Sequence, residues 1–252
     1  MSAQLKPYEG GDGEFDLVSI LLRGADVWNS WRIRNRGFAI DLSGADLGGA
    51  DLNEAILRQT NLSQADLGEA NLKQADLEEA SLSGARLGGT DLSGAHLRRA
   101  NLREAILPAA ILVKANLIGA ILIGADLMKA DLSAASASYA KLNSARLRGA
   151  NLIGADLYGA HLNSADLRGA NFTGANLREA MLDGSFLAGA DLCGADLRGA
   201  SLLGTHFQKT ILNRANLSGV DFRDAKLDGV DLRGADLREA NLADADLTET
   251  LI

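Results

Sequence analysis

The chain has 252 residues, of which 25 are basic and 33 acidic, and its formal net charge is −8. This acidic balance argues against a nucleic-acid-binding protein, because such proteins need a basic face to hold phosphates. Residues 1–13 lack the composition of a secretion leader, and no apolar run reaches the roughly eighteen residues of a membrane span. Cys193 is the single cysteine, so no intramolecular disulfide can form. Together these features predict a cytoplasmic protein that does not bind a membrane.

The first element expected along the chain is an amphipathic helix within residues 15–39, preceded by a flexible segment at residues 1–14. Apolar residues recur there at spacings of three and four, with Gly24 in the same series, which is the period of a helix. They are Leu17, Ile20, Leu21, Val27, Trp28 and Trp31. Asp16 suits the N-cap position, and arginines near the far end suit the helix dipole. We therefore predict one helix of about four to five turns and a short link, because two tryptophans would not fit inside a solenoid coil.

From Ile40 to Glu249 the sequence repeats every five residues without insertion or deletion, which gives forty-two consecutive pentads. Counting from Leu42 in steps of five, the central residue is Leu in thirty-eight pentads, and the exceptions are Ala137, Phe172, Phe207 and Phe222. Two residues before the centre the side chain is Ala in thirty-four pentads. Directly before the centre it is Asp in sixteen and Asn in nine. The central Leu column and the Ala column are therefore predicted to point inward. The Asp or Asn column is predicted to bind water or a backbone amide.

A period of five fits neither a helix nor a long alternating strand. A short fixed repeat indicates a solenoid, in which each unit buries its apolar face by stacking on its neighbours. Stacked coils would pair through backbone hydrogen bonds at a spacing of about 4.8 Å. The central Leu would then fill the axis, Ala would fit near the corners, and Asp or Asn would bind the turn amides.

Pentads such as A-N-L-I-G at 115–119, A-N-L-R-E at 175–179 and A-D-L-R-G at 195–199 resemble those of the pentapeptide-repeat family. The resemblance implies an all-β solenoid over residues 40–249, a right-handed quadrilateral β-helix in which four pentads form one square coil. It would have about ten and a half coils and a length on the order of 50 Å. The hexapeptide β-helix of acyltransferases is excluded because its period of six is absent. The segment V-W-N-S-W-R at 27–32 also resembles a leader that precedes many domains of this family.

The two ends of such a rod would expose unpaired amides and Leu side chains, which promote edge-to-edge association. The apolar residues of the N-terminal helix are expected to cap the first coil. After the last pentad only residues 250–252 remain. We expect the C-terminal edge to be blocked by Leu251 and Ile252 or by a second copy in a tail-to-tail homodimer.

Function on a rod of this kind must lie on its outward positions, where residues twenty apart should stack. One face carries a series that we name the Arg column: Arg58, Arg98, Arg178, Arg198 and Arg238. Asp196 and Asp236 precede two of these arginines by two residues, which favours a ladder of solvated charge pairs. The alternative is a stripe that docks an anion or a protein.

A second surface, which we name the mid-rod belt, consists of apolar residues at outward positions that are mostly polar elsewhere. It comprises Ile106, Pro108, Ile111, Val113, Ile118, Ile121, Ile123 and Met128. Contiguous exposed apolar side chains are typical of a contact with a partner. The alternative is that β-branched residues simply suit an extended backbone here. Just beyond the belt, Ala137 replaces a central Leu, which predicts a poorly filled coil with Tyr139 folded over the gap.

No catalytic, cofactor-binding or metal site is indicated. His96, His161 and His206 fall on different faces, and no Ser-His-Asp set or phosphate-binding loop is present. The sequence thus predicts a non-enzymatic protein–protein interaction or scaffold protein whose partner is an unidentified protein. The alternative, implied by the fluoroquinolone-resistance members that protect DNA gyrase, is an acidic mimic of duplex DNA. A net charge of −8 is weak for that role, because a duplex carries one negative charge about every 1.7 Å.

Overall fold

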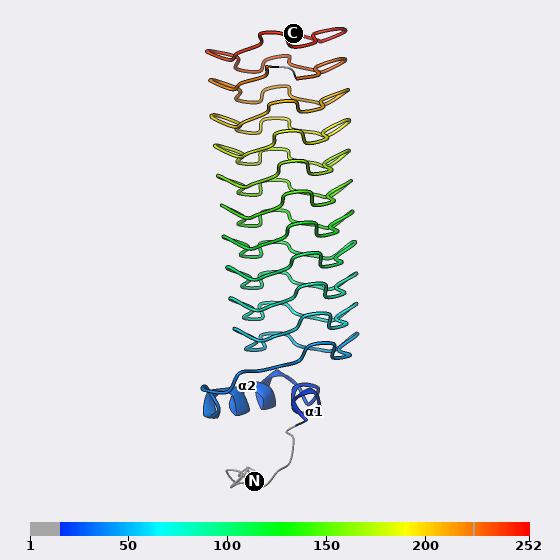
Figure 1. Ribbon diagram of the computed structural model, residues 1–252, viewed down its shortest axis with the longest axis vertical. Helices are drawn as coiled ribbons and strands as arrows, with labels where there is room; N and C mark the ends of the chain where they lie inside the picture. The colour runs from blue at the N-terminus through cyan, green and yellow to red at the C-terminus, as the bar shows by residue number, and fades with distance from the viewer. Residues whose placement is uncertain (1–15, 224) are drawn as a thin grey trace.

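The computed structural model describes residues 16–223 and 225–252, so the flexible segment predicted at 1–14 lies outside the described residues. The chain forms a stack of similar coils, and two helices lie across the N-terminal end of the stack (Figure 1). The two helices are α1 (Leu17–Leu21) and α2 (Ala25–Arg34). The described residues from Asp41 onward are built from turns and single-residue β-bridges.

The predicted single helix is wrong, because the structure divides it into α1 and α2. Gly24 separates them with a φ of 103°, a backbone conformation that favours glycine and ends a helix. Asp16 caps α1 as predicted, since its Oδ1 accepts the Ser19 N–H at 3.1 Å. Arg32 and Arg34 lie in the last turn of α2, as expected for the helix dipole.

Helix α2 is fixed to the first coils by hydrogen bonds to their backbone. The Trp28 indole Nε1 donates to the Ile56 carbonyl at 2.8 Å. The Asn29 amide binds two backbone groups, because its Nδ2 donates to the Glu54 carbonyl at 3.0 Å and its Oδ1 accepts the Ile56 N–H at 2.7 Å. The side chain of Asn29 therefore does what the backbone of a neighbouring coil would otherwise do.

Apolar contacts complete this attachment. Leu21 and Trp28 have no exposed surface, and Leu17, Ile20 and Trp31 are partly buried against the same core. Val27 is half-buried. Trp28 and Trp31 stack with ring centroids 5.4 Å apart. The two helices thus bury the side chains that the sequence placed on their apolar face.

The coils are joined by parallel bridges between residues twenty apart, from Asp41 with Asn61 to Asp231 with Leu251. Leu42 N–H donates to the Asn61 carbonyl at 2.7 Å, and Asn61 N–H donates to the Ile40 carbonyl at 2.9 Å. Each bridge involves one residue per pentad, and no longer strand forms among the described residues. The turns follow too closely for an extended segment, so the sheet is a ladder of single rungs.

Each pentad closes with a tight turn. The Ala45 N–H donates to the Leu42 carbonyl at 3.1 Å, and the residue before Ala45 in this turn has a positive φ, 67° at Gly44. Non-glycine residues adopt the same conformation at the equivalent position, for example Glu54 at 60° and Tyr139 at 58°. The ladder therefore holds these residues in a left-handed conformation that costs an L-amino acid on the order of 1 kcal/mol.

The interior consists of the central and the small columns predicted from the sequence. Leu52 and Phe172 have no exposed surface, and Ala137 is only 2 % exposed. Tyr139 does not fold over the core position of Ala137, so that prediction is wrong. It is 55 % exposed and lies against Tyr158, with ring centroids 5.4 Å apart, because a turn position points outward.

Candidate interaction surfaces

The residue before each centre binds the turn of its own pentad, as predicted for the Asp and Asn column. Asp41 Oδ1 accepts the Ser43 N–H at 2.9 Å, and Asn61 Oδ1 accepts the Ser63 N–H at 3.1 Å. Where Asn lies above Asp, its spare amide binds the coil below, as Asn61 Nδ2 does with Asp41 Oδ1 at 2.9 Å. This column therefore stabilises turns and links coils.

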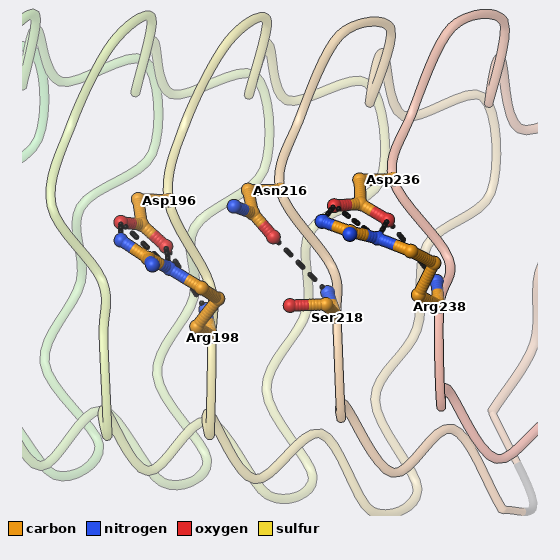
Figure 2. A network of polar contacts seen from close by, with 6 residues as sticks. All are labelled: Asp196, Arg198, Asn216, Ser218, Asp236 and Arg238. Carbon is orange, nitrogen blue, oxygen red and sulfur yellow. Dashed lines mark hydrogen bonds and ion pairs between the residues drawn. The ribbon is translucent and has the colours of Figure 1, made fainter.

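In the Arg column, Arg198 and Arg238 each lie on a carboxylate of their own pentad (Figure 2). The guanidinium of Arg198 donates to Asp196 from Nε at 2.8 Å and from a terminal nitrogen at 2.5 Å. Arg238 binds Asp236 in the same way, at 2.8 and 2.6 Å. The coil between them carries Asn216, whose Oδ1 accepts the Ser218 N–H at 3.2 Å (Figure 2). The predicted charge pairs are therefore formed at both sites.

The remaining members of the Arg column differ. Arg58 and Arg98 share Glu78, at 2.5 and 3.2 Å, so they pair between coils. Arg178 follows Asn176 instead of Asp and forms no ion pair in the described part of the chain. Four of the five guanidiniums thus already hold a carboxylate, and such exposed pairs contribute little stability.

The pairing within one pentad recurs wherever Asp precedes the centre and Arg follows it, as D-L-R or, at residues 221–223, as D-F-R. Asp166 with Arg168, Asp221 with Arg223 and Asp231 with Arg233 have N–O distances of 2.6 to 2.8 Å. The side-chain hydrogen bond from Arg233, followed by its backbone N–H, lowers the pKa of Asp231 to about 2. Arg238 acts likewise on Asp236, whose pKa also falls to about 2.

The mid-rod belt is on the surface as predicted. Ile106 is 46 % and Ile111 38 % exposed. The other six members are half-buried, none being in the core: Pro108, Val113, Ile118, Ile121, Ile123 and Met128. Successive members come from successive sides of the coil, since bridged residues lie twenty apart. The belt therefore wraps around the rod.

Comparison with known proteins identifies the repeat. The family described as Pentapeptide repeats matches the chain in eight copies, across residues 40–78, 80–112, 110–149, 145–187, 175–214 and 215–251. The chain belongs to this family. Pentapeptide-repeat proteins fold as right-handed quadrilateral β-helices, so this part of the predicted fold class is confirmed, while the number of coils stays a prediction.

Several solved pentapeptide-repeat proteins are similar to it. HetL, from the cyanobacterium Nostoc sp. strain PCC 7120 and involved in heterocyst differentiation regulation, is 38 % identical over 88 % of this chain and 94 % of its own, with a TM-score of 0.43. QnrB1, a plasmid-mediated fluoroquinolone resistance protein, is 21 % identical over 84 % of this chain and 89 % of its own, with a TM-score of 0.38. Rfr23, from the cyanobacterium Cyanothece 51142, is 32 % identical over 42 % of this chain and 63 % of its own, with a TM-score of 0.26. No curated protein sequence matches the chain.

A second apolar surface of this pentapeptide-repeat protein was missed by the sequence reasoning. Met181, Phe186 and Leu203 are 38, 43 and 45 % exposed. His206 stacks on Phe186, with ring centroids 5.0 Å apart. The signal was available, because all four occupy outward positions of the repeat, but the residues are separated by polar positions in the sequence.

Tyr158 has an unusual environment on the same face as the Arg column. Its hydroxyl is hydrogen-bonded to Glu179, and the edge of its ring meets Tyr139. The Glu179 hydrogen bond, then burial, raise the pKa of Tyr158 to about 12. The phenol is therefore held in its neutral form and is not prepared for proton transfer near neutral pH.

Chemistry-bearing groups stay dispersed in the described residues. No group of three or more His, Cys, Asp or Glu side chains there could hold a metal ion. Across residues 16–223 and 225–252, neither helix has the length and apolar character needed to cross a membrane.

Proposed function

We propose that this pentapeptide-repeat protein is a non-enzymatic interaction protein whose mid-rod belt docks a protein partner. The observation that carries the proposal is the exposure of Ile106 and Ile111, at 46 and 38 %, in successive pentads of the chain and in columns where most other residues are polar. Ile106 is bridged to Arg86 and Asp126, which shows that the ladder does not require an apolar residue there. Exposed apolar side chains in a contiguous band favour a contact surface.

The belt is a better candidate than the Arg column. A guanidinium that already binds a carboxylate must lose that bond before it binds a partner, and four of the five members are paired in this way. The isoleucines have no such competing contact to break. Their burial by a partner would gain roughly 25 cal/mol for each Å² of apolar surface removed from water.

The fixed spacing of the coils supports a scaffold role. Backbone bonds such as Leu117 N–H to the Ser136 carbonyl, at 2.7 Å, hold each outward position in register with its neighbours. A partner would therefore meet a preformed surface and pay little ordering entropy on this side of the contact.

The test is an affinity capture from a lysate of the source cell. The wild-type protein is compared with a variant in which Ile111, Val113, Ile121 and Ile123 are changed to Asn. A control variant changes Asn143 and Asn163 to Ser, which alters half-buried outward positions beyond the belt. We expect one protein to be captured by wild type and control and lost from the belt variant. All three should have the same circular dichroism spectrum and melting temperatures within a few degrees of one another. Equal capture by all three would refute the proposal.

The distribution of charge disfavours the alternative of a duplex DNA mimic. Residues 81–150 carry nine basic and four acidic residues, so the middle of the rod is positive. A duplex is negative along its whole length. Inhibition of DNA gyrase supercoiling by the purified protein would reverse this conclusion.

The ends of the rod have structural roles in the proposal. Helices α1 and α2 would block the first coil, because Asn29 and Trp28 already bind the backbone groups that a second chain would use. Leu251 and Ile252 are 51 and 81 % exposed, and the predicted tail-to-tail homodimer would cover them. Light scattering on the wild type and on a variant with both changed to Asp tests this: loss of a dimer in the variant supports it, and a wild-type monomer excludes it.

A further inference from the structure

The mid-rod belt lies in a part of the chain whose charge is opposite to that of its surroundings. Residues 40–80 contain nine acidic and two basic residues, and residues 151–252 contain fifteen acidic and nine basic. Between them, residues 81–150 contain nine basic and four acidic residues, although the whole chain has a net charge of −8. An apolar surface of this protein therefore coincides with the positive part of its repeat region.

On one face, the belt is bracketed by two cations. Ile121 is bridged to Asn101 on one side and to Lys141 on the other. The Glu104 N–H donates to the Ile123 carbonyl at 3.0 Å, which sets Ile123 in register with the pentad of Arg103. Arg103 and Lys141 are both exposed, and neither forms an ion pair within the described residues. Two coils separate their pentads, a distance on the order of 10 Å.

The adjoining face continues the same pattern. Ile106 is followed one coil later by Asp126, and Arg146 binds this carboxylate at 3.3 Å and approaches Met128 Sδ at 3.0 Å. Arg148, in the same pentad as Arg146, is exposed and has no ion pair in the part of the chain that the structure describes. The face of Ile121 therefore offers apolar side chains next to two cations that form no ion pair in the described chain. The face of Ile106 offers them next to Arg148, whose charge acts on Asp166 without a close ion pair.

The face of Ile111, which follows that of Ile106 around the coil, has different neighbours. Ile111 is bridged to Asp91 on one side and Asp131 on the other. A negatively charged partner would be repelled there and attracted on the faces of Ile121 and Ile106. The belt thus has a preferred side, although its apolar residues wrap the whole rod.

We infer that the faces of Ile121 and Ile106 dock an acidic segment of another protein that also carries aliphatic side chains. This inference rests on the proposed function and specifies its partner. Aliphatic groups of the segment cover Ile106, Ile121 and Ile123, while its carboxylates meet Arg103, Lys141 and Arg148. Charge complementarity at the border selects the partner and speeds association, and apolar burial supplies most of the affinity.

The experiment screens the intact protein against random sixteen-residue peptides displayed on phage. Three variants are assayed with the selected peptides: the belt variant, R103E/K141E, and the control K209E/R214E, which changes net charge equally at exposed positions elsewhere. We expect the selected peptides to be rich in Asp, Glu and aliphatic residues. Binding should fall at least about tenfold in R103E/K141E and in the belt variant, should persist in the control, and should weaken with added salt.

The contrary outcomes are distinct. Selection of neutral or basic peptides, or equal binding by R103E/K141E, overturns the inference. So does binding of phosphatidylserine vesicles or a duplex oligonucleotide that depends on Arg103 and Lys141 when no acidic peptide binds. In the lysate capture, a partner lost from the belt variant but kept by R103E/K141E leaves the docking surface intact and refutes only its acidic chemistry. A partner kept by both variants refutes the proposed function itself.

Discussion

In residues 151–252 five arginines form an ion pair with the aspartate two residues before them in the sequence. In residues 81–150 no arginine forms such a pair. Both regions have the same two inward columns, apart from Ala137 in one and three core phenylalanines in the other, and the difference in pairing comes from the residue before the centre. Arg198 follows Asp196, but Arg103 follows Asn101 and Arg148 follows Arg146. An Asp before the centre therefore neutralises the arginine of its own pentad, whereas an arginine without it is paired only where a neighbouring coil supplies a carboxylate, as Glu78 does for Arg98.

The first prediction tests whether the two regions share one interior. Leu102 and Leu182 occupy the same column and have no exposed surface. Changing either to Ala should lower the free energy of unfolding by about 2–5 kcal/mol, because a cavity replaces buried methyl groups. Urea unfolding followed by circular dichroism measures both losses. A difference between them much larger than about 1 kcal/mol would mean that the regions differ inside as well as outside.

The repeat could be predicted closely from sequence because each of its columns has one physical task. Leu at the centre, Ala two residues before it and Asp or Asn beside it each fit a single environment, and forty-two copies average out exceptions such as Ala137. The N-terminal segment was predicted less well. Gly24 fits a helical spacing as easily as a break, and its positive φ, which ends one helix before α2 begins, is not visible in the sequence.

The candidate surfaces were harder to predict, because pairing depends on which residues the coils bring together. The Asp196 and Arg198 pair is visible in the sequence, but Arg58 and Glu78 meet only through the twenty-residue register. The Phe186 and His206 stack has the same origin. Outward positions carry no common pattern, so their partners follow from geometry and not from composition.

A second prediction concerns a variant that gives the middle of the rod the ion pairing of residues 151–252. Asn101→Asp places D-L-R at residues 101–103, and we expect Arg103 to turn onto the new carboxylate. Affinity for the selected acidic peptides should fall about two- to fivefold, and the free energy of unfolding should change by less than about 0.5 kcal/mol. Asn241→Asp is the control, because its pentad has no arginine. Isothermal titration calorimetry measures the affinities, and an equal loss in both variants would show that net charge alone matters.

A third prediction uses the acid response of the C-terminal pairs. The pKa of Asp231 and of Asp236 is lowered to about 2 by its arginine, so both carboxylates favour the folded state above their unfolded pKa of about 3.9. This stabilisation is lost as the pH falls from about 4 to about 2. Arg233→Gln with Arg238→Gln should move both pKa values back toward the ordinary range and shrink the drop in melting temperature between pH 5 and pH 2.5. Carboxyl titration by NMR checks the pKa values, and unchanged curves would show that arginine is not the cause.

The smallest effect is expected where the two regions meet, at Tyr158. Its pKa of about 12 is attributed first to the hydrogen bond with Glu179. Glu179→Gln should therefore lower the pKa of Tyr158 toward the ordinary value of about 10. The melting temperature should stay within a few degrees of the wild-type value, because Glu179 is exposed. Phenolate absorbance against pH measures the change in a chain with Tyr8→Phe, and Glu249→Gln serves as a distant control. If Tyr158 titrates at the same pH in Glu179→Gln, then its contact with Tyr139 holds the proton, and this boundary is fixed by ring packing and not by charge.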